Sequence, residues 1–194
     1  MNYLAHLYLA QPTPDSHFGN LLGDFRRGVD TSAYSADVVA GLRNHYLVDA
    51  YTDNHPYVKE AKSCFSAQRR RFAGIALDVL FDHYLIKHWL NYSATDFDSF
   101  CDQAYQRLEQ RIAIMPAQMQ PVVGSMVEQG WLSNYRALNG VAFALDKISA
   151  RIRFPNQFNG SIEEITPNYQ ALEECFTAFF PQLIAHVAAH SPEL

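Results

Sequence analysis

Apolar residues recur along most of this chain at intervals of three and four, and strictly alternating stretches are scarce. The clearest case is the segment 66–92, in which Phe72, Ile75, Val79 and Ile86 keep this spacing and no proline intervenes. Such spacing places apolar side chains on one stripe of an α-helix, so the pattern predicts an all-α protein. We expect helices over residues 2–10, 18–27, 37–54, 66–92, 97–114, 117–129, 139–150 and 168–189.

Prolines and glycines divide these helical segments. Pro12 and Pro14 are expected to end the first helix, Gly28 the second and Pro56 the third, because proline does not fit a helix interior and glycine favours a helix end. The prolines that separate the later helices are Pro116, Pro155 and Pro167. The stretch 151–167 is the best loop candidate, and it is too short for a domain linker. We therefore expect one helical bundle, a single domain over residues 1–194.

Composition excludes several functional classes. The chain has 194 residues, 48% of them hydrophobic, and a net charge of −5, with a pI near 5.9. A general nucleic-acid binder would be basic, so we expect no nucleic-acid partner. Three scattered cysteines indicate reduced thiols rather than a disulfide framework. No segment is long and apolar enough to span a bilayer and no signal-peptide pattern is present, which predicts a cytoplasmic protein. Nothing in the sequence indicates an oligomeric state.

Side chains that can bind metal ions gather in the first 88 residues. They are His6, Asp24, His45, Asp49, Asp53, His55, Asp78, Asp82, His83 and His88. Three pairs are four residues apart: His45 with Asp49, Asp49 with Asp53, and Asp78 with Asp82. Residues four apart lie one above the other on a helix, so each pair can converge on one point. Mixed imidazole and carboxylate ligands suit Mn²⁺, Fe²⁺ or Zn²⁺.

Simpler interpretations compete with metal binding. A lone His6 on an apolar face is more commonly a hydrogen-bonded core histidine, and His45 with Asp49 can form an ion pair on a helix surface, worth about 0.2–0.5 kcal/mol. Asp78 and Asp82 resist that interpretation because apolar residues surround both in the sequence. Burying two like charges one turn apart is unfavourable, and a divalent cation would offset the cost.

Metal-assisted hydrolysis is the chemistry that these residues favour. The chain has no G-x-S-x-G elbow and no phosphate-binding loop with its lysine. The pair Gly19 and Gly23 indicates close packing of a helix backbone, with Asp24 projecting beside it. A bound cation would activate water and polarise a phosphoryl or acyl oxygen, while a free carboxylate or imidazole would move the proton.

Five short motifs, in this order and spacing, resemble the acyl carrier protein phosphodiesterase family, also called acyl carrier protein hydrolyases. They are residues 1–7 (MNYLAHL), 19–28 (GNLLGDFRRG), 45–49 (HYLVD), 52–56 (TDNHP) and 77–83 (LDVLFDH). The resemblance implies an all-helical fold distantly related to the HD phosphohydrolases, and a need for Mn²⁺, with Mg²⁺ or Fe²⁺ as alternatives. It also implies hydrolysis of the phosphodiester that joins 4′-phosphopantetheine to a serine of holo-acyl carrier protein, which leaves the apo form.

We assign site residues on the motifs and this resemblance together. The expected metal ligands are Asp24, His45, Asp49, Asp78 and Asp82. The expected catalytic or supporting residues are His6, Asp53 and His83. HD proteins carry adjacent His-Asp, whereas this chain has Asp82-His83. Neighbours lie about 100° apart on a helix, which directs the two side chains to different sides.

Five arginines are expected to bind the acyl carrier protein. Acyl carrier protein is small and acidic, and guanidinium groups pair well with phosphate and carboxylate. The expected partner-binding residues are Arg26, Arg27, Arg69, Arg70 and Arg71. Two alternatives stay open at this point. One is an HD-type phosphohydrolase acting on a nucleotide or another small phosphate ester, and the other is a non-catalytic helical module that binds an acidic partner.

Overall fold

The computed structural model describes residues 1–154 and 156–193, and within these ranges the chain forms α-helices and short 3-10 turns but no strand. The all-α prediction is therefore confirmed. Pro155, expected to mark a break, lies outside the described residues. The helices are α1 (Tyr3–Tyr8), α2 (Pro14–Leu22), α3 (Ala36–Asn54), α4 (Pro56–Ser63), α5 (Ala73–Lys87), α6 (Phe97–Glu109), α7 (Gln120–Gln129), α8 (Leu138–Arg151), α9 (Ile162–Ile165) and α10 (Tyr169–His190).

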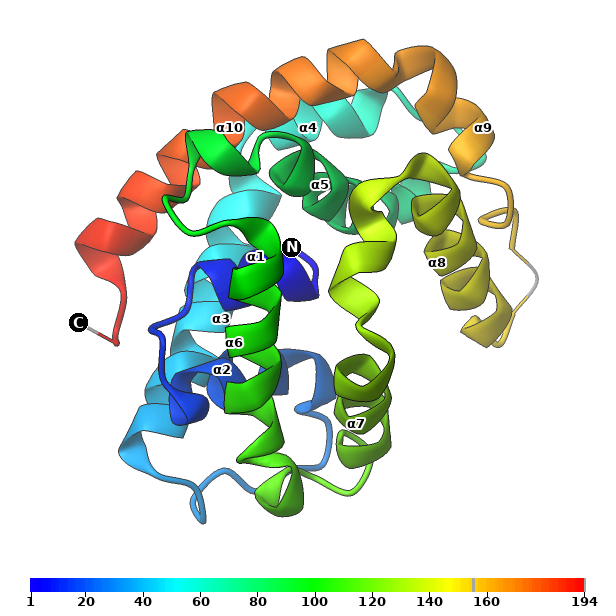
Figure 1. Ribbon diagram of the computed structural model, residues 1–194. Helices are drawn as coiled ribbons and strands as arrows, with labels where there is room; N and C mark the ends of the chain where they lie inside the picture. The colour runs from blue at the N-terminus through cyan, green and yellow to red at the C-terminus, as the bar shows by residue number, and fades with distance from the viewer. Residues whose placement is uncertain (155, 194) are drawn as a thin grey trace.

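The short helix α1 lies in the middle of the molecule. Figure 1 shows the N-terminus beside it, with α3 behind, α6 in front and α8 to one side. Helix α10 arches over the top along α4 and also packs on α3 and α5. Leu4, Ala5, His6 and Leu7 of α1 are all buried, and they join one apolar cluster with the other helices. Six residues are too few to form a stable helix alone, so α1 depends on these neighbours.

Helices α2 and α3 make the most extensive contact in the fold, and glycines allow it. A Cβ atom at Gly19 would lie 2.2 Å from the Val38 carbonyl oxygen and 2.9 Å from the Cα of Gly41. The two backbones therefore approach as closely as glycine permits. This contact confirms the packing expected for Gly19, and it sets the position of the 3-10 turn Gly23–Phe25 beside α3.

Several expected boundaries are wrong, and proline explains two of them. Pro14 and Pro56 begin helices instead of ending them, since the first helical position needs no backbone N–H donor. Helix α2 thus starts four residues before the predicted position, with Thr13 accepting a hydrogen bond from the Ser16 N–H. Helix α4, starting at Pro56, was not predicted at all.

The helix expected over residues 66–92 is shorter, because residues at both of its expected ends form hydrogen bonds outside a regular helix. Before α5, the backbone N–H and hydroxyl of Ser66 donate hydrogen bonds to Glu164. After α5, the Trp89 indole donates to the Thr95 carbonyl in a tighter 3-10 turn. The expected loop 151–167 likewise contains the short helix α9 and the 3-10 turn Thr166–Asn168.

Two further expectations concern the cysteines and the membrane. Cys64, Cys101 and Cys175 are all free thiols, as their spacing predicts. None of the helices in the described ranges has the length and apolar character that crossing a bilayer requires.

The glycine contact gives a stability prediction. We expect Gly19→Ala to lower the free energy of unfolding by about 1–3 kcal/mol, because the added methyl group overlaps the backbone of α3. Urea denaturation measures the change. Gly124→Ala in α7 is the matched control, since its Cβ would meet no atom within 4 Å, and we expect it to be neutral or to stabilise by up to about 1 kcal/mol. Equal losses in the two variants would contradict the role of this contact.

Candidate metal centre

His6, His45 and Asp49 form a cluster in which one ligand atom from each lies within 4.8 Å of the others. Nε2 of His45 is 3.0 Å from Oδ2 of Asp49, and Nε2 of His6 is 3.3 Å from Oδ1 of the same carboxylate. The two imidazole rings stack with their centroids 4.0 Å apart. His45 and Asp49 are one turn apart on α3, and His6 comes from α1, so a helix pair brings the three together.

The orientation of His45 is fixed from its far side. Its Nδ1 lies 2.7 Å from the backbone carbonyl oxygen of Asn20 in α2. A carbonyl only accepts hydrogen bonds, so Nδ1 carries the proton and donates it there. Nε2 then faces the Asp49 carboxylate with either a second proton or a lone pair directed at a shared cation. Metal-binding histidines commonly donate their other N–H to a backbone carbonyl in this way.

Gly23 leaves the room that the His45 ring occupies. A Cβ atom at position 23 would lie 2.1–2.4 Å from three atoms of that ring. The motif glycine is therefore explained by this imidazole rather than by helix packing alone. Asn20 is held in turn by Asn44, whose side-chain amide donates a hydrogen bond to Asn20 Oδ1 at 2.9 Å.

His6 is fully buried, and neither ring nitrogen makes a hydrogen bond within the described part of the chain. Its 3.3 Å approach to Asp49 lacks hydrogen-bond alignment. Burial lowers the pKa of His6 to about 3, so the ring is neutral. A neutral imidazole offers a lone pair, as a metal ligand must. Unsatisfied buried polar atoms are costly, and a cation between His6 and Asp49 would satisfy this one.

A positive charge already lies between two of the carboxylates. The Met1 amino group is 3.1 Å from Oδ1 of Asp49 and 3.1 Å from Oδ1 of Asp78. Burial opposes its charge, but Asp78 and Asp49 raise the pKa of this amino group to about 11. Burial likewise opposes ionisation of Asp49, yet its contacts with His45, His6 and Met1 lower the pKa of that carboxyl. The site thus favours a cation beside Asp49 and Asp78.

Asp24 lies at the edge of the cluster, on the 3-10 turn Gly23–Phe25. Its side chain reaches solvent, but protein surrounds it on the other sides, and this desolvation raises the pKa of its carboxyl while the His45 charge opposes the shift. The Asp24 charge also acts on Asp49, Asp78 and the Met1 amino group. Of the five expected ligands, His45 and Asp49 lie in the cluster, Asp78 is linked to Asp49 through the Met1 amino group, and Asp24 lies close enough for its charge to act on theirs.

Asp82, the fifth expected ligand, does not lie in the cluster and instead binds the backbone of α1. It is fully buried, and its two oxygens accept hydrogen bonds from the backbone N–H groups of Leu4 and Ala5, each at 3.0 Å. These are orphan donors of the first turn of α1, so Asp82 caps that helix from α5. Burial raises the pKa of Asp82 to about 7, and the two N–H groups oppose this shift. Asp82 positions α1, and with it His6.

Asp53 and His83 are not brought into the cluster. Asp53 is exposed and pairs with Lys62 of α4, with Nζ 3.0 Å from Oδ1. The ring of His83 lies 2.8 Å from the Tyr135 carbonyl oxygen through Nδ1 and 2.8 Å from the Tyr169 hydroxyl through Nε2. Both nitrogens of His83 are therefore engaged away from Asp49.

Several of the expected partner-binding arginines are engaged within the fold. Arg69 donates to the carbonyl oxygens of Gln157 and Asn159, and Arg70 donates to those of Phe65 and Ser63. Arg26 donates to the Val29 carbonyl oxygen. The Arg71 guanidinium lies 4.8 Å from the centre of the Phe154 ring, and Arg27 is exposed.

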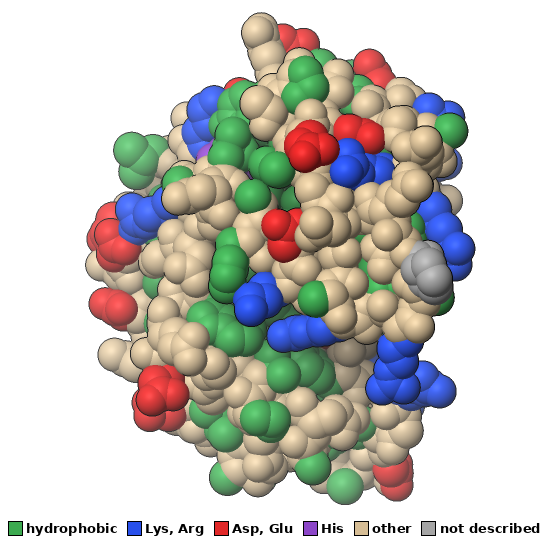
Figure 2. Space-filling view, turned by 90° about the vertical axis from the view of Figure 1, so that its right-hand side faces the viewer, with side chains coloured by type: hydrophobic (Ala, Val, Ile, Leu, Met, Phe, Trp, Pro, Cys, Tyr) green, Lys and Arg blue, Asp and Glu red, His purple; other side chains and the backbone are tan. Residues whose placement is uncertain are grey.

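The face of the molecule that carries α7 to α9 is mixed in charge. Figure 2 shows acidic side chains beside basic ones in its upper part, and Arg69 pairs with Glu163 and Glu164 of α9. This face therefore presents no uniform basic surface, and a docking role for the five arginines stays a prediction.

The donor set fits a divalent transition-metal ion. Two imidazoles, one carboxylate between them and two further carboxylates nearby match the ligands that Mn²⁺ and Fe²⁺ accept once the imidazoles are neutral. Sequence reasoning placed His6 among the proton-transfer candidates and did not assign roles to Asn20 or Met1. The His6 signal was weak because its partners lie about forty residues away along the chain.

Comparisons with known proteins agree on one family. The family model described as acyl carrier protein phosphodiesterase matches residues 1–183. A relative named acyl carrier protein phosphodiesterase in Pectobacterium atrosepticum is 37% identical over 185 residues, which is 95% of this chain and 96% of the relative. A relative with the same name in Yersinia enterocolitica is 38% identical over 186 residues, 95% of this chain and 96% of the relative. No solved structure matches, so the likeness to HD phosphohydrolases stays a prediction.

The cap on α1 gives a prediction that separates Asp82 from a metal ligand. We expect Asp82→Ala to lower the free energy of unfolding by about 2–4 kcal/mol, because two buried N–H groups lose their acceptors. Hydrogen exchange of the Leu4 and Ala5 amides should speed up before the rest of the core opens. Asp102→Ala, on the exposed side of α6, is the control and should change neither quantity. Unchanged exchange at Leu4 and Ala5 would contradict the capping role.

Proposed function

Because this chain belongs to the acyl carrier protein phosphodiesterase family, we propose that it hydrolyses the phosphodiester linking 4′-phosphopantetheine to a serine of holo-acyl carrier protein. The names of the relatives support a phosphodiesterase activity connected with acyl carrier protein. They favour that substrate over a nucleotide or another small phosphate ester, the alternative that the sequence leaves open.

The cluster of His6, His45 and Asp49 is the main support for this proposal. We propose that Nε2 of both imidazoles and a carboxylate oxygen of Asp49 hold a divalent cation, which we take to be Mn²⁺. Asp78 and Asp24 supply further carboxylate oxygens nearby. The bound ion would lower the pKa of a water molecule and stabilise negative charge on a phosphoryl oxygen.

The residues of the chain contribute orientation and charge. The Nδ1–H of His45 donates to the Asn20 carbonyl oxygen, which keeps the Nε2 lone pair directed at the cluster. His6 is held by the burial of α1 and by Asp82, and its position excludes water from one side of the site. Asp24 is exposed and makes no contact with the Met1 amino group such as Asp49 and Asp78 make, so we assign to it the exchange of a proton with the reacting groups.

The Met1 amino group occupies the side of Asp49 that a cation would share. An ammonium group and a divalent ion both satisfy the pair Asp49 and Asp78, but the Met1 amino group donates no hydrogen bond to His6, whereas a divalent ion would also accept a lone pair from His6 and from His45. The non-catalytic alternative, a helical module that binds an acidic partner, offers no reason for an unpartnered buried imidazole beside a carboxylate. The cluster therefore favours an enzyme.

A direct assay tests the reaction. Holo-acyl carrier protein incubated with the enzyme and Mn²⁺ should lose the mass of phosphopantetheine, as measured by mass spectrometry of the intact carrier. We expect Asp49→Asn to lower the rate at least 100-fold, because one ligand charge is lost at the centre of the cluster. Asp53→Asn, one turn further on the same helix, pairs outside the cluster and should keep most of the activity. An unchanged carrier, with turnover of a nucleotide instead, would refute the proposed substrate.

Metal affinity gives a second prediction, which does not depend on the substrate. We expect one tight Mn²⁺ site per chain, counted by the electron paramagnetic resonance signal of free Mn²⁺. Gly23→Ala should weaken it about 10–100-fold, because the new methyl group displaces the His45 ring. Gly124→Ala should bind as the wild type does. Equal affinity of the Gly23→Ala variant and the wild type would argue against His45 as a ligand.

A further inference from the structure

A cavity of about 400 Å³ opens between the start of α1, the 3-10 turn Trp131–Arg136 and α8. Its volume falls in the range of roughly 300–1,000 Å³ that is usual for small-molecule sites. Residues far apart in sequence build it, so no local motif indicates it. Its lining includes Asn2 and Tyr3 from the start of α1 and Trp131, Phe143, Lys147 and Arg151 from the later elements.

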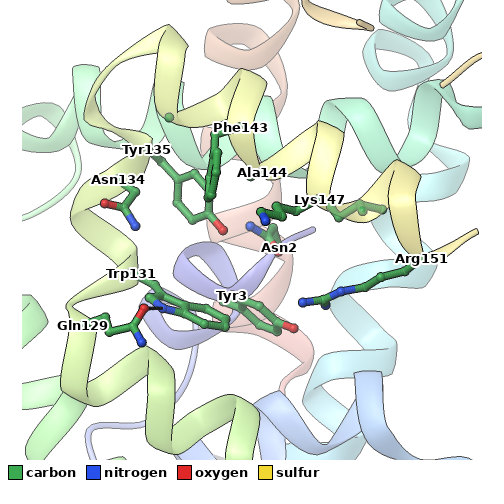
Figure 3. Close-up of a pocket in the computed structure, with 12 residues that line it drawn as sticks. Asn2, Tyr3, Gln129, Trp131, Asn134, Tyr135, Phe143, Ala144, Lys147 and Arg151 are labelled. Carbon is green, nitrogen blue, oxygen red and sulfur yellow. Dashed lines mark hydrogen bonds between the residues drawn. The ribbon is translucent and has the colours of Figure 1, made fainter. Parts of the chain in front are cut away.

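The cavity adjoins the metal cluster through Tyr3. Asn2 and Tyr3 line it, and they directly follow Met1, whose amino group contacts Asp49 and Asp78. The charges of Asp24 and Arg151 both act on the Tyr3 hydroxyl. Figure 3 shows this hydroxyl pointing toward the guanidinium of Arg151. Arg151 therefore lies beside the Tyr3 hydroxyl, on which the charge of Asp24 also acts.

The lining is suited to an extended, polar chain with an anionic end. Tyr3, Trp131 and Phe143 provide aromatic surface, and the Phe143 side chain is 63% exposed. Asn2, Gln129 and Asn134 provide amide groups that both donate and accept hydrogen bonds. Lys147 and Arg151 are one turn apart on α8, and no acidic residue lines the cavity. Lys147 also lies 5.2 Å from the centre of the Phe143 ring.

A second cavity differs from the first in its charge, although it too has an amide and an aromatic ring. It lies between α3, α4 and α10, and no lysine or arginine lines it. Its residues are Leu47, Ala50, Tyr51, Asn54, His55, Pro56 and His186. Cationic side chains, amides and aromatic rings thus occur together in the cavity beside the cluster.

We propose that the cavity beside Tyr3 binds the pantetheine arm of the substrate, with Arg151 on its phosphate and Trp131 against the chain. The arm is an extended chain with two amide groups, a dimethyl-substituted carbon and a phosphate at one end. A guanidinium binds phosphate through two hydrogen bonds, and indole offers a broad apolar face. The identity of the arm rests on the proposed function, whereas the cavity and its charge do not.

Isothermal titration calorimetry of the Mn²⁺-loaded protein with free 4′-phosphopantetheine tests the inference. We expect Arg151→Gln to raise the Kd about 10-fold or more for 4′-phosphopantetheine, yet to leave the Kd for pantetheine, which has no phosphate, unchanged. Trp131→Ala should raise both. Arg153→Gln, an exposed arginine two residues beyond and outside the lining, is the matched control and should bind as the wild type does. Thermal denaturation verifies that each variant is folded.

The same variants separate this inference from the proposed function. If binding depends on Arg151 and Trp131 but holo-acyl carrier protein is not cleaved, the cavity assignment stands and the proposed reaction fails. If cleavage occurs and both variants keep the wild-type Kd for the free arm and the wild-type KM for the carrier, the cavity assignment is overturned. Absence of binding at millimolar 4′-phosphopantetheine overturns it as well.

Discussion

Asp49 and Asp78 lie close enough to share one positive charge, and much of the surrounding structure serves that requirement. The Met1 amino group meets it here, at 3.1 Å from each carboxylate. Two neighbouring carboxylates without a cation repel each other, so a positive charge that binds between them is stabilising. The stacked imidazoles of His6 and His45 lie beside this pair, and the Met1 amino group donates no hydrogen bond to His6. The proposed divalent ion would contact all four side chains together.

The scaffold explains how these groups meet at one point. Glycines let α2 approach α3, and this contact places Gly23 under the His45 ring and Asn20 behind it. Asp82 of α5 caps the first turn of α1, which holds His6 and Met1 against α3. The motif residues thus divide into those that would face the proposed cation and those that hold the elements in place. Mutations in either group would impair the site, but only the second group should change stability strongly.

Helical spacing predicts which side chains can converge, and the neighbouring element decides whether they do. The pairs His45 with Asp49, Asp49 with Asp53, and Asp78 with Asp82 have the same spacing, but only the first meets at a common point. Lys62 of α4 holds Asp53, and the first amides of α1 hold Asp82. The reversed pair Asp82-His83 points in two directions, as the 100° between helix neighbours predicts.

Apolar periodicity was enough to predict the fold class. The helix boundaries depend on contacts such as Ser66 with Glu164, which no local pattern contains. The cavity beside Tyr3 could not be predicted from the sequence for the same reason, since its walls come from residues 2–3 and 129–151.

Anomalous diffraction from crystals grown with Mn²⁺ tests the metal centre most directly. The account predicts a manganese peak between Nε2 of His6, Nε2 of His45 and a carboxylate oxygen of Asp49, with the Met1 amino group displaced from that oxygen. A map with no peak between these three side chains, and with the Met1 amino group still on Asp49, would contradict it. So would a peak at another site that leaves His6 without a partner.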